Sequence, residues 1–165
     1  MEMSIAAERV LEAVDEMTAT MITAVSTLVR IPSVSGTDAE NDAQHHMATL
    51  MDEGGLECDR WQIDLADMYV RSDFPGVEVE RREAWGLVGR LPGTDNGPSL
   101  MLNGHVDVVP IGDPHAWTFP PFDGEVRDGH LHGRGSCDMK AGLIAAHWAV
   151  QAIRSAGIRL GGDLL

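Results

Sequence analysis

Residues 99–142 read SLMLNGHVDVVPIGDPHAWTFPPFDGEVRDGHLHGRGSCDMKAG, and the rest of the fold is organised around them. The apolar start of this stretch predicts a buried central strand over Ser99–Asn103. His105 and Asp107 follow it, and alternate residues of an extended chain share one face. A carboxylate beside a histidine fixes the tautomer of the imidazole, which suits metal ligation or acid–base chemistry.

A second acidic residue, Asp138, follows a glycine-rich turn in the run GRGSCDMK, residues 133–140. The glycines allow close approach of the backbone, and Asp138 is predicted to lie where a helix begins. Two carboxylates and one histidine in such loops indicate a metal site more than a nucleophile. The simpler alternatives are a helix N-cap for Asp138 and a turn cap for Asp107.

The two motifs resemble the N-terminal signatures of the co-catalytic zinc peptidases and deacylases. This family includes acetylornithine deacetylase, succinyl-diaminopimelate desuccinylase, aminoacylase and glutamate carboxypeptidase. The resemblance is carried by HVDVVP at 105–110, GRGSCDMKAG at 133–142, and the intervening WTFPPF at 117–122 and GEVRDG at 124–129. It covers nearly the whole chain, and IPSVS at 31–35 also resembles the N-terminal loop of the family.

The resemblance implies a role for each residue of the site. His105 is a metal ligand, Asp107 is the acid that hydrogen-bonds the far nitrogen of His105 during catalysis, and Asp138 bridges two metal ions. The peptide bond between Asp138 and Met139 is expected to be cis. Cys137 matches no ligand of the family, and the six other histidines are read as solvent-facing or supporting residues: His45, His46, His115, His130, His132 and His147.

The implied cofactor is a pair of divalent metal ions, zinc first, with cobalt or manganese as alternatives. In the family the remaining ligands and the general base, a Glu-Glu pair among them, come later in the chain. Gly161–Leu165 resembles the start of the strand that leads to that pair. We therefore expect residues 1–165 to be the N-terminal portion of a single catalytic domain, a fragment that is inactive by itself, without the family's lid or dimerisation domain.

The resemblance implies removal of the acyl group from an N-acyl amino acid by metal-activated water. A metallo-carboxypeptidase or dipeptidase acting on short peptides is the alternative within the family. A non-catalytic, stand-alone domain is the alternative outside it. The sequence assigns no substrate-binding residue, and a homodimer is one arrangement open to the full-length form.

Composition and charge indicate which partners and which cellular compartment to expect for this protein. The formal net charge is −14, which disfavours a nucleic-acid partner. Neither a signal peptide nor a run of membrane-spanning length is recognised, so a cytoplasmic protein without a membrane partner is expected. The two cysteines, Cys58 and Cys137, are expected to be free, buried thiols.

Alternating helices and apolar strands predict an α/β fold, and the resemblance refines this to a three-layer mixed sheet between helices. Helices are predicted by apolar spacing and by capping and stop residues, over Ile5–Val29, Asp38–Glu53 and Met139–Ala156. Strands are predicted over Leu56–Ile63, Ala84–Leu91 and Leu160–Leu165, the second forming a hairpin with Ser99–Asn103. A long loop is predicted over 64–83 and a short hairpin around Arg127–Gly129.

Overall fold

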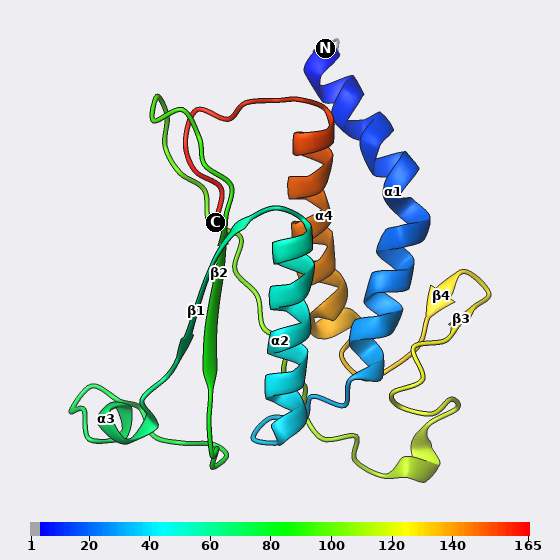
Figure 1. Cartoon of the computed structure of the whole chain (residues 1–165). Coiled ribbons are helices and arrows are strands. Elements are labelled where there is room, and N and C mark those ends of the chain that lie inside the picture. The colour runs from blue at the N-terminus through cyan, green and yellow to red at the C-terminus, as the bar shows by residue number, and fades with distance from the viewer. Residues whose placement is uncertain (1–3) are drawn as a thin grey trace.

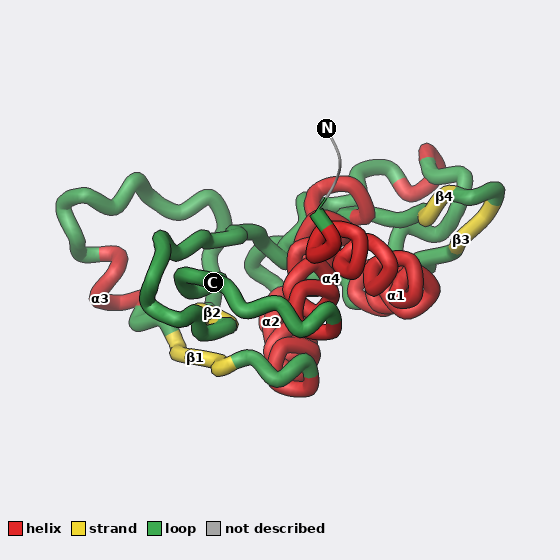
Figure 2. Tube along the Cα trace, turned by 90° about the horizontal axis from the view of Figure 1, so that it is seen from above, coloured by secondary structure: helices red, strands yellow, loops and turns green. Residues whose placement is uncertain are grey.

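Three long helices lie on one side of a two-stranded antiparallel sheet in the computed structural model, which describes residues 4–165 (Figures 1 and 2). Helices α1 and α4 run side by side, and α2 packs on both strands. The elements are α1 (Ile5–Arg30), α2 (Asp38–Glu53), β1 (Glu57–Gln62), α3 (Leu65–Tyr69), β2 (Trp85–Arg90), β3 (Val126–Arg127), β4 (His130–Leu131) and α4 (Ala141–Ser155).

The ends of α1 lie where its sequence predicts them. The Ser4 hydroxyl accepts a hydrogen bond from the Ala7 N–H at 3.3 Å, which satisfies one of the unpaired amides of the first turn. At the other end, Ile31 turns to extended geometry (φ −80°, ψ 114°) because it precedes Pro32. The chain therefore leaves the helix as an extended loop, and this loop runs to the candidate site.

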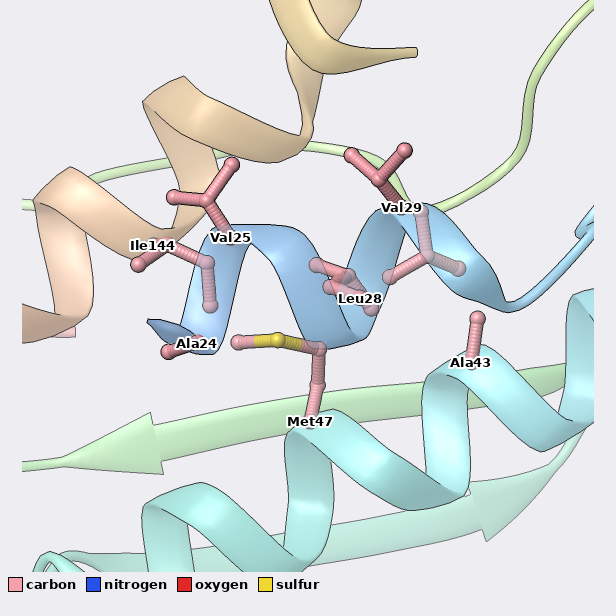
Figure 3. Close-up of a cluster of buried hydrophobic side chains, with 8 residues drawn as sticks. Ala24, Val25, Leu28, Val29, Ala43, Met47 and Ile144 are labelled. Atoms are coloured by element: carbon pink, nitrogen blue, oxygen red, sulfur yellow. The ribbon is translucent and has the colours of Figure 1, made fainter. Parts of the chain in front are cut away.

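The core lies where α1, α2 and α4 meet (Figure 3). Leu28 and Val29 of α1, Met47 of α2 and Ile144 of α4 are essentially inaccessible to solvent. Full burial of such a side chain is worth about 1.5–3 kcal/mol. Val106 belongs to the same cluster, so the core fixes the segment that carries His105 against the end of α1.

The predicted hairpin between the second strand and Ser99–Asn103 is wrong. β2 pairs with β1 instead, and Leu164 lies between Leu91 and Leu100, antiparallel to the first and parallel to the second. The Leu164 N–H donates to the Leu91 oxygen at 3.0 Å, and the Leu165 N–H donates to the Leu100 oxygen at 2.9 Å. The turn at 92–98 separates Leu91 from Leu100, and the segment that contains Leu164 lies between them. The pairing is therefore antiparallel on one side of Leu164 and parallel on the other.

Ser99–Asn103 is also not the buried strand that its apolar residues predict. Leu100 and Met101 are 59% and 63% exposed, and Leu100 forms an isolated bridge only. Within residues 4–165 its backbone is paired on one side, to the segment that contains Leu164. The apolar residues of 99–103 predict a buried strand, but no described element covers them, and they stay exposed.

Two local predictions need correction and one is confirmed. The predicted loop at 64–83 contains the short helix α3, whose N-cap is Asp64, a residue type that favours helix starts. The helix predicted from Met139 begins at Ala141, after a wide turn over Ser136–Lys140. The β3–β4 hairpin forms as predicted, with positive φ at both Asp128 (52°) and Gly129 (75°) in its turn.

Both cysteines are free thiols, but neither is buried as predicted: Cys58 is half-buried and Cys137 is exposed. Cys137 lies in the exposed turn before α4, while Cys58 lies on β1. Among residues 4–165, none of the helices combines the length and the apolar character needed to cross a membrane.

Candidate metal centre

The loop after α1 holds the segment that carries His105 and Asp107. The Val108 N–H donates to the Ser33 oxygen at 2.9 Å, and the Ser35 N–H donates to the Val108 oxygen at 3.0 Å. The fully buried Ser33 hydroxyl adds a bond to the Val106 oxygen at 2.7 Å. The site segment is therefore fixed by main-chain bonds to a neighbour about 70 residues earlier in sequence, not by a regular sheet.

His105 lies between the two predicted carboxylates. Its Nδ1 is 3.1 Å from Asp107 Oδ1 and 3.0 Å from the Asp107 main-chain oxygen. Its Nε2 is 3.3 Å from Asp138 Oδ1. The structure thus brings together all three residues that the sequence singled out, from segments about 30 residues apart.

Asp138 is presented by the turn before α4. Gly135 adopts φ +82°, and its oxygen accepts the Lys140 N–H at 2.9 Å. The Asp138–Met139 peptide bond is cis, as the resemblance implied. The Asp138 side chain is 89% exposed, and it makes no capping bond to α4, whose N-cap position is Lys140. The helix-cap alternative therefore does not describe this residue.

The three side chains fit a cation between His105 and Asp138. Asp107 Oδ1 and the Asp107 main-chain oxygen are both acceptors, so in a neutral imidazole the proton belongs on Nδ1 and the Nε2 lone pair faces Asp138 Oδ1. Two acceptors 3.3 Å apart attract each other only with a proton or a cation between them. Ligands on one tetrahedral zinc ion, at about 2.0–2.2 Å each, lie about 3.4 Å apart.

This arrangement distinguishes His105 from the other histidines. His115 is also 3.1 Å from a carboxylate, that of Asp113, but its side chain is 95% exposed and no third group joins the pair. His132 packs on Phe119. His147 is buried and not solvent-facing, one of the two positions expected for it, and burial lowers its pKa.

Two side chains of the described residues, His105 and Asp138, could serve as ligands at this point. Within residues 4–165 no three or more His, Cys, Asp or Glu side chains surround a common point at which a metal ion could bind. Val106 lines a neighbouring cavity of about 420 Å³ together with Glu40, but none of the three site residues lines it. The described part of the site is therefore a pair of candidate ligands, His105 and Asp138, with Asp107 on the Nδ1 side of His105.

Two residues that the sequence reading did not assign to the site support it. The Ser35 hydroxyl donates to Asp107 Oδ2 at 2.6 Å. The buried ammonium of Lys140 ties the turn that carries Asp138 to the end of α1. The IPSVS motif contains Ser35 and the DMK motif contains Lys140, so the sequence marks both residues. The sequence does not show which groups the Ser35 hydroxyl and the Lys140 ammonium contact.

The fold and these side chains define an α/β protein with a histidine that lies between two carboxylates. Residues 101–165 match Peptidase family M20/M25/M40. An N-formyl-4-amino-5-aminomethyl-2-methylpyrimidine deformylase of Halalkalibacterium halodurans is 32% identical over 160 residues, 96% of this chain and 34% of the relative. Succinyl-diaminopimelate desuccinylase 2 of Ruegeria sp. is 42% identical over 118 residues, 72% of this chain and 25% of the relative.

These similarities match residues 101–165 of the chain to peptidase family M20/M25/M40, which agrees with the family that the motifs predicted. The chain spans between a quarter and about a third of the length of these curated relatives.

Solved structures share its fold. The di-peptidase Dug1p from Saccharomyces cerevisiae superimposes with a TM-score of 0.80 at 18% identity, over 98% of this chain and 34% of that one. Human carnosine dipeptidase 1 gives a TM-score of 0.73 at 19% identity, over 95% of this chain and 33% of that one. The predicted α/β class is confirmed.

Proposed function

We propose that this chain supplies the first part of the metal centre of an amide hydrolase, with His105 and Asp138 as ligands. The single observation that carries the proposal is the 3.3 Å separation of His105 Nε2 and Asp138 Oδ1, with Asp107 on the other ring nitrogen. Asp107 keeps the proton on Nδ1 and makes Nε2 the better electron-pair donor. A bound divalent cation would supply Lewis acidity and lower the pKa of a water molecule.

For the reaction, we propose removal of an acyl group from an amine nitrogen by activated water. Support comes from the curated relatives, since a deformylase and a desuccinylase both release an acyl group from nitrogen. An N-acyl amino acid is our first choice of substrate. Cleavage of a dipeptide is the second, because both named structural neighbours are dipeptidases.

For residues 1–165 alone, we propose weak cation binding and no turnover. A catalytic zinc ion commonly takes three protein ligands, and a two-metal centre takes more. The described residues provide two, so the remaining ligands and the general base must come from elsewhere in the active protein. In that protein we propose two divalent ions, zinc first with cobalt or manganese as alternatives, a cytoplasmic location and a homodimer as one assembly to test.

Cation titration of the 165-residue chain tests the centre. We expect Zn²⁺ or Co²⁺ to bind reversibly, and His105→Ala and Asp138→Asn each to abolish this binding. His115→Ala is the matched control, because His115 has the same 3.1 Å carboxylate contact without a third group. Equal binding by the parent and His105→Ala would refute the assignment, as would tight binding of two zinc ions to a site of two ligands.

A further inference from the structure

We propose that Ser35 is a positioning residue of this centre, which sets the orientation of the His105 ring by fixing the carboxylate of Asp107. The Ser35 hydroxyl donates to Asp107 Oδ2 at 2.6 Å, and Asp107 Oδ1 lies 3.1 Å from His105 Nδ1. One carboxylate therefore joins the hydroxyl to the imidazole. The value of this orientation for cation binding rests on the proposed function.

The hydroxyl proton of Ser35 has two acceptors in reach, and the carboxylate is the stronger. Asp107 Oδ2 lies at 2.6 Å and the Val108 main-chain oxygen at 3.3 Å. A charged oxygen accepts a shorter and stronger bond than a neutral carbonyl, and about 2.5–2.7 Å is typical of O–H···O⁻. The short bond is thus the one to Asp107.

The two carboxylate oxygens of Asp107 contact two different side chains. Oδ1 faces the imidazole and Oδ2 faces Ser35, so rotation of the carboxylate would break both contacts. Without the hydroxyl, the carboxylate keeps one side-chain partner and can turn about its terminal torsion, which is broad and roughly two-fold. His105 Nδ1 then loses its charged acceptor and keeps only the neutral Asp107 main-chain oxygen at 3.0 Å, so the preference for the proton on Nδ1 weakens.

The loop itself does not depend on this hydroxyl. The Ser35 N–H donates to the Val108 oxygen at 3.0 Å, and the Gly36 N–H donates to Glu40 Oε2 at 2.7 Å. Arg81 in turn holds Glu40 through both carboxylate oxygens at 3.0 Å. Removing the Ser35 hydroxyl should therefore free Asp107 while the loop stays in place.

The test compares Ser35→Ala with Ser35→Thr, which keeps the hydroxyl, and with Thr37→Val. Thr37 is the matched control because its hydroxyl, in the same loop, also makes a 2.6 Å bond, but to the Val34 oxygen. The first readout is the long-range ¹H–¹⁵N spectrum of the His105 ring in the metal-free 165-residue chain. The second is the affinity for Co²⁺ or Zn²⁺.

We expect one tautomer, protonated on Nδ1, in the parent, in Ser35→Thr and in Thr37→Val, and a mixture in Ser35→Ala. The cation affinity of Ser35→Ala should fall by about 10–100-fold, as is typical when the partner of a ligating histidine is lost. Ring signals of Ser35→Ala that match those of the parent would overturn the inference.

The ring spectrum also separates this inference from the proposed function. A parent chain that binds no cation would refute the metal centre, yet the tautomer comparison would still decide the role of Ser35. Loss of tautomer order in Thr37→Val to the same extent as in Ser35→Ala would assign the effect to the loop and contradict the positioning role.

Discussion

The ammonium group of Lys140 lies 3.0 Å from the main-chain oxygen of Leu28, a residue 112 positions earlier in the sequence. It also donates to the Ile31 oxygen at 2.8 Å, and the side chain is completely buried. Leu28 lies in the last turn of α1 and Ile31 is the C-cap residue, a region where the helix dipole favours a cation. Burial lowers the pKa of Lys140 to about 8, and the contact fixes the start of α4 against the end of α1.

Replacement of Lys140 by Met should therefore lower the free energy of unfolding. The substitution keeps most of the apolar volume and leaves two carbonyl oxygens without the ammonium, which predicts a loss of about 1–3 kcal/mol. Urea denaturation followed by circular dichroism measures it. Arg30→Met is the control, because Arg30 also donates to a main-chain oxygen, that of Asp123, but at an exposed position. A Lys140→Met chain as stable as Arg30→Met would contradict the capping role.

Gly135 and Gly129 form a matched pair for testing the turn before Asp138. Both have positive φ, +82° and +75°, but a Cβ at Gly135 would overlap Val108 whereas a Cβ at Gly129 meets nothing within 4 Å. Gly129→Ala should cost about 1–2 kcal/mol from backbone strain alone. Gly135→Ala should cost more, since the buried Val108 has to move, and it should weaken cation binding. Equal stability losses in thermal unfolding would show that the contact with Val108 is easily relieved.

The two cysteines should differ in reactivity. Burial, together with the neighbouring Asp52, raises the pKa of the Cys58 thiol to about 11, whereas Cys137 is exposed. At pH 8 we expect iodoacetamide to modify Cys137 first and Cys58 at least about tenfold more slowly, because the thiolate is the nucleophile. Mass spectrometry of Cys58→Ser and Cys137→Ser chains identifies each rate. Modification of both thiols at one rate in the folded chain would be the contrary result.

The raised pKa of Cys58 also predicts how the free energy of unfolding changes at alkaline pH. An unfolded thiol, with its ordinary pKa of 9.0, releases its proton before the folded one, with a pKa of about 11. Between these values the unfolded chain binds fewer protons, so the Cys58 contribution to the free energy of unfolding falls as pH rises from 9 to 11. Urea titrations across this range should show a shallower fall in Cys58→Ser than in the parent.

Acid should destabilise the fold through His147. Burial, and to a lesser extent Arg154, lowers the pKa of this side chain below its ordinary value of 6.5. The unfolded state then binds more protons than the folded state just below pH 6.5, so the free energy of unfolding falls as pH decreases through the folded pKa. His147→Leu should flatten this dependence. Identical acid curves for His147→Leu and the parent would contradict this account.

Helices α1 and α2 could be predicted closely because their signals are local. Ser4 and Pro32 mark the ends of α1, and Gly54 follows α2 directly, so the predicted bounds agree with the structure to within a residue. The pairing partner of β2 could not be predicted from such local signals. The sequence places a turn at 92–98 between two apolar runs, but whether they pair directly depends on Leu164, which lies far along the chain and inserts between them.

For the candidate site, the sequence by itself singled out His105, Asp107 and Asp138 and the motifs on which they lie. His105 and Asp107 share a face because they are two residues apart in extended chain, a local consequence of backbone geometry. Only the tertiary structure decided that Asp138 faces His105 at 3.3 Å and that Ser35 and Lys140 support them. These contacts join residues dozens of positions apart, and the packing of α1 against α4 sets them.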